Sequence, residues 1–416
     1  MELTNETAAH LVNEAIQKLP DKSEEPKEGR GIVMSAGGVK YQINAWVCIQ
    51  MLRRLGCELP IQCWYLGDTE RNRAWEQVVA PYDVECIDAY EVREQHPHIR
   101  LHGWESKPYV IQHSPFAEVL FLDADNVPVR DPTFLFDTPQ YQKTGTVFWP
   151  DFDRLGPERL AWRVFGEIPY RDEQEVESGQ IVVDKRRCWK ALELCHWYMQ
   201  NSNNFFFFHV HGDKEVFHLA WRKLDQPYAM PERGIDALTG VMCQHDFEGN
   251  RIFQHRNMRK WSFYDNPQTQ GFLYENECRE YINELKHLWS PAANEPATPE
   301  NAAALSRLDG KVFEYHRVGY DHRPICLRRD GIFAEGAATC EYYWTIRDGV
   351  MAVANEDGKR TMELAPPNTE FGKDNGWITR RCQCCSSLDA AGAGQHGSLS
   401  RLDARFDDGC DRLHSD

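Results

Sequence analysis

The strongest constraint on the fold is a short apolar run that ends on acidic residues. Residues 119–122 (VLFL) are continuously apolar, which is typical of a strand buried on both faces of a sheet. Asp123, Asp125 and Asn126 follow at once. In open α/β sheets, ligands bind beyond the carboxyl ends of the strands. The sequence therefore predicts a central strand with a polar site at its end.

The segments around this run alternate between strand-like and helix-like patterns. That alternation is typical of an α/β fold with a largely parallel sheet. Strands are predicted at residues 31–35, 61–66, 84–87, 119–122, 145–148 and 180–183, with a further strand leading to 254. Helices are predicted at residues 8–18, 42–55, 71–79, 104–113, 187–200, 213–224 and 275–288.

Changes in composition divide the chain into five parts. We expect one helix and a charged linker in residues 1–29, and the α/β domain in 30–289. Residues 290–304 are rich in Pro, Ala and Asn, as in a linker. Residues 305–379 carry short apolar runs separated by Asp-Gly turns, which predicts a small β-rich module. Residues 380–416 lack apolar patterning and are expected to be disordered.

Charge and cysteine content exclude several classes of protein. The chain has 64 acidic and 47 basic residues, and its net charge of -17 argues against a nucleic-acid partner. The 14 cysteines form no regular disulfide framework. The first 30 residues lack the apolar core of a signal peptide, and no run reaches the ~20 apolar residues that span a bilayer. We therefore expect a cytoplasmic protein with reduced thiols and no membrane span.

Asp123 and Asp125 are candidate metal ligands. Two carboxylates separated by one residue at a strand end both face a ligand if the chain turns there. Mn2+ and Mg2+ prefer oxygen ligands and commonly bridge carboxylates to phosphates. The alternative is a capped turn, in which Asp and Asn side chains bond local backbone amides.

The segment 253–261 (FQHRNMRKW) carries the next candidates. His255 offers a nitrogen ligand, and Arg256 and Lys260 offer positive charge for phosphate oxygens. Taken alone, His255 is an ordinary half-buried histidine. An upstream pair of aspartates favours its interpretation as a metal ligand.

Polar residues on loops beside the sheet complete the candidate site. Glu177, Gly179 and Gln180 precede a predicted strand, and a glycine there lets the backbone approach a ligand closely. Asp213 opens a helix, so its position favours a role as helix N-cap over a role in the site. Lys107 either approaches the ligand or lies in solvent.

Two further segments have simpler interpretations. Ser35, Ala36 and Gly37 follow the first strand, where the base and ribose of a nucleotide would enter. The run Phe205–Phe208 is assigned to the core or an interface rather than to a sugar-binding platform.

Taken in chain order, these segments resemble the fungal-type α-mannosyltransferases of glycosyltransferase family 71, which include Golgi enzymes of mannan synthesis. The similarity covers roughly residues 30–265. The matching pieces are the Gly31 strand, 52–56 (LRRLG), 59–65 (LPIQCWY), Gly103-Trp104 with Lys107, 121–128 (FLDADNVP), Asp131-Pro132, 145–152 (GTVFWPDF), 177–184 (ESGQIVVD), 212–214 (GDK) with Phe217, and 255–257 (HRN) with Lys260.

The resemblance implies a fold and an activity. The fold would be GT-A, the nucleotide-diphospho-sugar transferase fold, with a mixed sheet flanked by helices. The activity would be metal-dependent transfer of a hexose, with retained α configuration, from a nucleotide-diphosphate sugar to a glycan or other hydroxyl acceptor. GDP-mannose is the family's default donor, and Mn2+ or Mg2+ is the expected cation.

The resemblance also implies roles for the candidate residues. Asp123, Asp125 and His255 would bind the metal, and the catalytic candidates Asp213 and Glu177 would lie near the transferred sugar. The donor-binding candidates are Ser35, Ala36, Gly37, Lys107, Asp123, Gly179, Gln180 and Lys260, of which Lys260 would contact the diphosphate.

The chain departs from the family pattern, and two other functions stay open. The fungal enzymes are membrane-anchored, whereas we find no anchor here, and the β-rich module has no match in them. A sugar nucleotidyltransferase would carry a Gly-rich phosphate loop with a basic residue after the first strand, which residues 35–40 resemble only loosely. A non-catalytic nucleotide- or glycan-binding module is the third hypothesis, and the intact Asp123, Asp125 and His255 argue against it.

Overall fold

A computed structural model describes residues 2–98 and 100–293, together with 303, 308, 311–317, 321–328, 331–335, 340–347, 350–365, 377–382 and 397–401. The chain divides into two compact units. The first consists of Met1–Gly37, Asn44–Gly67 and Tyr82–Arg279, and the second of Gly38–Ile43, Asp68–Pro81 and Glu280–Asp416. The domain boundaries given above remain predictions.

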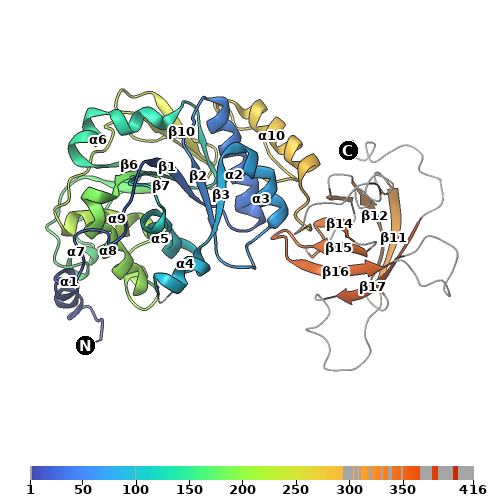
Figure 1. Ribbon diagram of the computed structural model, residues 1–416, viewed down its shortest axis with the longest axis horizontal. Helices are drawn as coiled ribbons and strands as arrows, with labels where there is room; N and C mark the ends of the chain where they lie inside the picture. Colours follow the sequence, from blue (N-terminus) through green and yellow to red (C-terminus); the bar gives the residue numbers. More distant parts are fainter. Residues whose placement is uncertain are drawn as a thin grey trace. The chain divides into compact units, whose positions relative to one another are not determined.

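The first unit is built on a six-stranded sheet in the order β3-β2-β1-β4-β7-β6 (Figure 1). Strands β3, β2, β1 and β4 are parallel, whereas β7 runs antiparallel to both β4 and β6. The predicted mixed α/β sheet is thus confirmed. The strands are β1 (Arg30–Ser35), β2 (Ile61–Tyr65), β3 (Val84–Asp88), β4 (Glu118–Leu122), β6 (Thr146–Arg154) and β7 (Gln174–Asp184).

The predicted helices are present with shifted ends, and three short ones, α4, α6 and α7, were not predicted. These three span seven residues or fewer, too few for a periodic apolar pattern. The helices are α1 (Ala8–Ile16), α2 (Val39–Arg54), α3 (Arg73–Val79), α4 (Ala89–Gln95), α5 (Ser106–His113), α6 (Pro139–Thr144), α7 (Ala161–Val164), α8 (Lys185–Gln200), α9 (Asp213–Lys223) and α10 (Glu275–Leu288). The 3-10 turns are η1 (Ala80–Tyr82), η2 (Gly103–Glu105), η3 (Pro132–Asp137) and η4 (Phe206–Phe208).

Helices α5, α8 and α9 pack together against the sheet (Figure 1). Phe121 of β4 and Ile181 of β7 meet Leu192 of α8 and Phe217 of α9 in one continuous apolar core. Each of these side chains is buried, which stabilises it by about 1.5–3 kcal/mol relative to full exposure. This core fixes the ends of β4 and β7 relative to the start of α9, where the candidate residues lie.

A second, antiparallel sheet in the order β5-β10-β9-β8 was largely missed by the sequence patterns. Its strands are β5 (Asn126–Pro128), β8 (Asp236–Leu238), β9 (Val241–His245) and β10 (Arg251–His255). Strand β5 begins immediately after the acidic motif, and β10 pairs with it so that His255 lies opposite Asn126. This pairing joins the two sequence segments that carry the metal-ligand candidates.

The second unit contains an eight-stranded sheet in the order β13-β12-β11-β18-β17-β16-β15-β14, which confirms the β-rich C-terminal part. Phe313, Trp344, Met351 and Leu364 form its apolar core. Strands β17 and β18 extend into the tail that was expected to be disordered, and the rest of that tail lies outside the described residues. The strands are β11 (Lys311–Arg317), β12 (Asp321–Leu327), β13 (Phe333–Glu335), β14 (Tyr343–Arg347), β15 (Val350–Ala354), β16 (Arg360–Ala365), β17 (Trp377–Cys382) and β18 (Gly397–Arg401).

The cysteines agree only in part with the expectation of reduced thiols. Cys48, Cys63 and Cys195 are buried free thiols, whereas Cys326 is disulfide-bonded. Over the part of the chain that the structure describes, no helix combines the length and apolar character that crossing a membrane requires.

Candidate active site

The acidic motif lies in the turn that joins β4 to β5. The Asp123 amide donates to Gly179 O (2.8 Å), and the Asn126 amide donates to Asp123 O (2.9 Å), so the turn is held by β7 and closed on itself. In the described part of the chain, the Asp123 and Asp125 carboxylates face lysine and histidine side chains rather than local amides. The capped-turn alternative therefore does not describe this motif.

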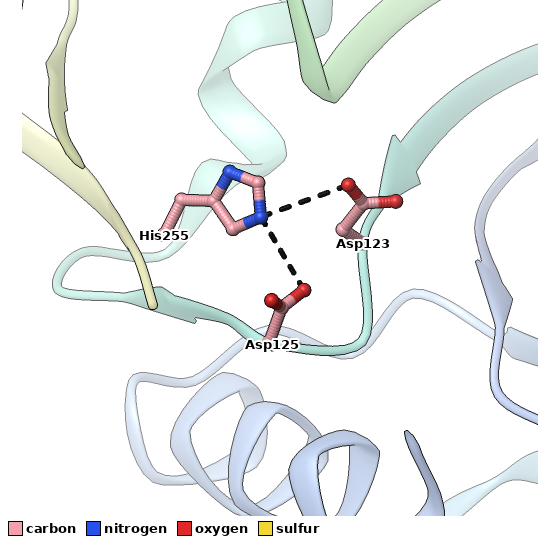
Figure 2. A group of neighbouring side chains, drawn as sticks. All are labelled: Asp123, Asp125 and His255. Carbon is pink, nitrogen blue, oxygen red and sulfur yellow. Dashed lines mark ion pairs between the residues drawn. The ribbon is translucent and has the colours of Figure 1, made fainter. Parts of the chain in front are cut away.

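His255 completes a cluster of three potential metal ligands. Its Nε2 lies 3.3 Å from Asp125 Oδ1 and 3.7 Å from Asp123 Oδ2. Figure 2 shows the imidazole on β10 and the two carboxylates of the β4–β5 turn pointing toward one another. One ligand atom from each residue lies within 4.8 Å of the other two. The tertiary structure thus unites the three predicted ligands.

This donor set fits a divalent cation. Two carboxylates and one imidazole are ligands that Mn2+ and related ions accept, and carboxylate-rich sites favour hard cations. Asp125 and His255 are buried at 3% and 5% exposure, while the Asp123 side chain keeps 19% of its surface accessible. The cluster is therefore open to a ligand on the Asp123 side.

Glu177 contacts Nδ1 of His255, the ring nitrogen that does not face the two aspartates. Its Oε1 lies 3.4 Å from His255 Nδ1, and its Oε2 accepts from the Gly179 amide (2.6 Å) and from Gln180 Nε2 (3.1 Å). A carboxylate against the second ring nitrogen fixes the orientation of a metal-binding histidine. From the sequence, residues 177–180 were expected to lie on a loop. That was wrong, because they lie inside β7, whose pairing with β4 and β6 continues past them.

Position 179 must be a glycine because the His255 imidazole packs directly against its backbone. A Cβ atom at this position would lie 2.5 Å from His255 Nδ1 and 2.8 Å from Glu177 Oε2. Both distances are shorter than non-bonded atoms tolerate, so a side chain would displace the imidazole. A close approach of a ligand to the backbone at Gly179 was predicted, and in this structure the group that approaches is the His255 imidazole.

Lys107 lies in the site and not in solvent. It is 8% exposed, and its Nζ donates to Asp123 Oδ2 (2.9 Å) and lies 3.1 Å from Asp213 Oδ2. Ser178 joins this network by donating from Oγ to Asp213 Oδ2 (2.6 Å). Helix α5 therefore places a buried ammonium group between two carboxylates.

Asp213 is not the N-cap of α9, contrary to the sequence-based preference. The cap position is Gly212, whose φ of +86° is a conformation that favours glycine. Asp213 is thus the first helical residue, where its carboxylate reaches Lys107 and Ser178. An acidic residue in the first turn is also favoured by the helix dipole.

Lys260 and Arg256 separate into two roles. Lys260 pairs with Asp125 and donates to Asn257 O (3.0 Å). Arg256 was expected to offer charge to phosphate, but it is fully buried, with its guanidinium 3.7 Å from the centre of the Trp261 ring. Its positive charge therefore stabilises the loop that carries Lys260.

The remaining candidates lie close to this network. Ser35 Oγ is 3.3 Å from the hydroxyl of Ser106, the residue before Lys107. The Ala36 amide donates to Trp64 O (2.8 Å), which holds the loop of residues 35–37 at the end of β1. The fully buried Gln180 accepts from Asn126 Nδ2 (2.8 Å) and thereby links β7 to the acidic turn.

Burial and ion pairing shape the charges of the site. Burial raises the pKa of Asp123 to about 6, against the opposing effect of Lys107 and His255. Burial also opposes ionisation of Asp125, but His255 and Lys260 outweigh it and hold the pKa of Asp125 below its usual range. The pKa of His255 is raised despite burial, because Asp125 and Glu177 stabilise its protonated form. A cation at this position would therefore compete with a proton on His255.

Two residues of the network, Asn126 and Ser178, were not among the predicted site residues. Asn126 donates to Gly179 O (3.0 Å) as well as to Gln180, and Ser178 bridges Lys107 and Asp213. Both stand next to predicted site residues, so proximity in the sequence was the available signal.

The chain is similar in sequence to known mannosyltransferases. A family described as “Mannosyltransferase putative” matches residues 29–166 and 158–256. The chain is 25% identical over 287 residues to the alpha-1,2-mannosyltransferase MNN2 of Saccharomyces cerevisiae, covering 58% of this chain and 47% of that protein. It is 22% identical over 299 residues to MNN5 of the same yeast, covering 57% and 50%. The chain thus spans about half the length of these two relatives.

Solved structures that align with the chain include the glycosyltransferase GlyE of Streptococcus pneumoniae TIGR4, with a TM-score of 0.35, 15% identity, and coverage of 50% of this chain and 46% of that one. The family match spans more than half of the 416 residues and includes Asp123, Asp125 and His255. The six-stranded mixed sheet with its acidic turn after β4 is also the arrangement that the sequence resemblance implies. The chain therefore belongs to the mannosyltransferase family that the resemblance indicated, glycosyltransferase family 71.

Proposed function

We propose that this chain is a retaining glycosyltransferase that moves a hexose from a nucleotide-diphosphate sugar to a hydroxyl acceptor. The observation that carries the proposal is the convergence of Asp123, Asp125 and His255 at the carboxyl end of β4, with Lys107 and Lys260 beside them. Mannose is the default sugar of the family, GDP-mannose the default donor, and the relatives MNN2 and MNN5 are named alpha-1,2-mannosyltransferases.

Asp123, Asp125 and His255 would hold the divalent cation, for which Mn2+ is our first choice and Mg2+ our second. When bound, such a cation neutralises the negative charge of a departing diphosphate. Glu177 keeps the imidazole in position through its contact with Nδ1. The catalytic role that the resemblance implies for Glu177 is therefore best assigned as positioning of His255.

Lys260 and Lys107 supply positive charge on two sides of the acidic pair. Lys260 lies on the loop after β10, next to Asp125, where it would contact the donor diphosphate. Lys107 lies between Asp123 and Asp213, where it would contact the donor on the side of the sugar. The loop of Ser35, Ala36 and Gly37 ends β1 close to Lys107 and would receive the nucleoside.

Asp213 is the carboxylate that we assign to the transferred sugar. It is 4% exposed and held by Lys107 and Ser178, so its position is fixed before a substrate arrives. Fixed polar groups reduce the reorganisation that the transition state requires. Gly179 and Gln180 support the same region through their hydrogen bonds with the acidic turn.

The reaction requires no strong base from the protein. The acceptor oxygen forms a bond to the anomeric carbon, while the bond from that carbon to the β-phosphate oxygen breaks on the same face. The proton of the acceptor hydroxyl passes to the departing phosphate oxygen. The products are an α-glycoside and a nucleoside diphosphate, and the protein contributes orientation and electrostatic stabilisation.

The test is incubation of the purified chain with a panel of nucleotide sugars, with and without Mn2+. We expect metal-dependent release of nucleoside diphosphate that is lost in Asp125→Ala and after chelation with EDTA. Formation of a nucleotide sugar from a nucleoside triphosphate and a sugar phosphate would instead establish a nucleotidyltransferase. Donor binding without turnover would establish a non-catalytic binding module.

The cytoplasmic location remains a prediction from the sequence. The disulfide-bonded Cys326 is a feature of oxidising compartments, which is evidence against that prediction. Microscopy of the tagged full-length protein in its native cell tests it.

A further inference from the structure

Trp104 is a large apolar side chain that is half exposed at the point where the chain enters a buried helix. Its exposure is 49%, whereas Glu105, Ser106 and Lys107, which follow it, are all buried. Single exposed apolar residues are common on protein surfaces, so exposure alone indicates no function. The position of Trp104 relative to Lys107 and Asp213 is the observation that indicates a function.

The indole lies at the edge of the proposed catalytic network. A Cβ built on Gly212 would lie 3.3 Å from Cδ2 of Trp104, so the ring covers the backbone of the residue before Asp213. Trp104 also lies close to Lys107 in the sequence, because it precedes Lys107 by one helical turn. Lys107 Nζ and Asp213 Oδ2 are themselves 3.1 Å apart.

The surrounding residues hold the indole in place. Its ring packs edge-to-face on Phe207, with 6.0 Å between the ring centroids, and the centroid of the His211 ring lies 5.9 Å away. We call these three side chains the Trp104 platform. The run Phe205–Phe208 was assigned to the core or an interface. Phe205 and Phe206 are buried, whereas Phe207 is half-buried and Phe208 is 75% exposed.

Two buried glutamates brace the platform. Glu105 accepts from Ser202 Oγ (2.7 Å), which ties the turn of Trp104 to the turn before Phe207. Glu215 accepts from the backbone amide of His211 (3.2 Å), which fixes the turn between His211 and α9. These hydrogen bonds hold the backbone turns that carry the platform, which reduces the ordering that a stacking ligand requires.

We propose that the Trp104 platform is the acceptor subsite, and that it binds the apolar face of a pyranose ring while presenting a sugar hydroxyl to the site. This inference rests on the glycosyltransferase function proposed above. A carbohydrate fits better than an apolar acceptor, because the indole lies against Gly212, the residue before Asp213, and the Asp213 carboxylate lies 3.1 Å from Lys107 Nζ. Ligand sites commonly combine such aromatic walls with a few placed polar groups.

The experiment measures donor hydrolysis and acceptor transfer separately in the full chain. The donor is the nucleotide sugar that the panel above shows to be hydrolysed fastest. The acceptors are methyl α-D-mannopyranoside and α-1,6-mannobiose, with glycerol as a hydroxyl acceptor that has no ring face. The variants are Trp104→Ala and the conservative Trp104→Phe. The control is Tyr170→Ala, an aromatic residue of 44% exposure whose contacts are with Trp162 and Asp172.

We expect Trp104→Ala to raise the KM for both pyranosides by about tenfold or more, because stacking on the indole is lost. Donor hydrolysis, the donor KM and transfer to glycerol should stay within about twofold of wild type. Trp104→Phe should recover part of the acceptor affinity, and Tyr170→Ala should match wild type.

Three results would overturn the acceptor subsite. They are an unchanged pyranoside KM in Trp104→Ala, an equal loss of donor hydrolysis and transfer, and a wild-type protein that hydrolyses donor but transfers to neither pyranoside. Failure of the glycosyltransferase proposal is distinct, since the wild-type protein would then hydrolyse no donor at all.

Discussion

His255 Nε2 lies 3.3 Å from Asp125 Oδ1, although His255 ends β10 and Asp125 lies in the β4–β5 turn, at a distant point in the chain. The pairing of β10 with β5 produces this contact by setting His255 opposite Asn126, the residue after Asp125. A nitrogen ligand and two carboxylates are thereby held by the backbone of one small sheet and one turn. The metal affinity of this site should therefore depend on His255 as much as on the aspartates.

Replacing His255 with alanine should weaken Mn2+ binding by at least about 100-fold, since loss of a residue that only orients a ligand already costs about 10–100-fold. Glu177→Gln, which alters that orienting contact, should fall within the smaller range. Isothermal titration of the purified variants with Mn2+ measures both. His10→Ala, at an exposed position on α1, serves as the control. Equal Mn2+ affinity in wild type and His255→Ala would refute the assignment of His255 as a ligand.

Gly179→Ala should reduce donor turnover by about 100-fold, because the new methyl group would displace the imidazole by a fraction of an ångström or more. Overpacking should also cost about 1–3 kcal/mol of folding stability. Gly234→Ala is a matched control, since a Cβ there would meet nothing within 4 Å. Donor hydrolysis and chemical denaturation check the two effects. Wild-type turnover in Gly179→Ala would show that the imidazole position is unimportant.

Lys185→Met should lower the free energy of unfolding by about 2–4 kcal/mol, because it leaves buried carbonyl groups without a donor. Lys185 Nζ donates to Ile111 O (3.1 Å), Gln112 O (3.2 Å) and Ser114 O (2.6 Å) at the end of α5. Urea denaturation measures the loss.

The control for this change is Lys190→Met on the same helix, whose ammonium pairs with the exposed Asp21. A surface pair of this kind contributes little, so the change in stability should stay within about 0.5 kcal/mol. Equal stability of both variants would contradict the proposed capping of α5 by Lys185.

Folding stability should fall in acid partly through Glu173. Burial opposes ionisation of this carboxyl, but His218 and Arg222 lower its pKa from 4.5 to about 2. The folded protein therefore binds fewer protons here than the unfolded chain. The stabilisation is complete above about pH 4.5 and is lost as the pH falls toward about 2.

Glu173→Gln should accordingly be less stable than wild type by about 1–2 kcal/mol at pH 7, after allowance for solvent screening, and the gap should close toward pH 2. Denaturation midpoints between pH 2 and pH 7 test this. Asp172→Asn, which removes a carboxylate from an exposed pair with Arg154, is the matched control. A constant gap between Glu173→Gln and wild type at all pH values would rule out the ionisation effect.

The sequence alone determined the main sheet and the place of its chemistry. Residues 119–122 of β4 form a continuous apolar run, and such a run can be buried on both faces only in the middle of a sheet. The turn residues Asp123 and Asp125 follow within the same short segment, so local pattern sufficed to locate them. The order of the matching segments along the chain then indicated the family.

The tertiary structure decided what each polar residue does. Asp213 was expected to cap its helix, but Gly212 takes that position and frees the carboxylate to meet Lys107. Arg256 was expected to offer its charge to phosphate oxygens, but its guanidinium is buried against the Trp261 ring. Sequence patterns report local backbone preference and periodicity, whereas these contacts join distant segments through charge and packing. His255 becomes a partner of Asp125 only because β10 pairs with β5, and a pattern within either segment does not encode that pairing.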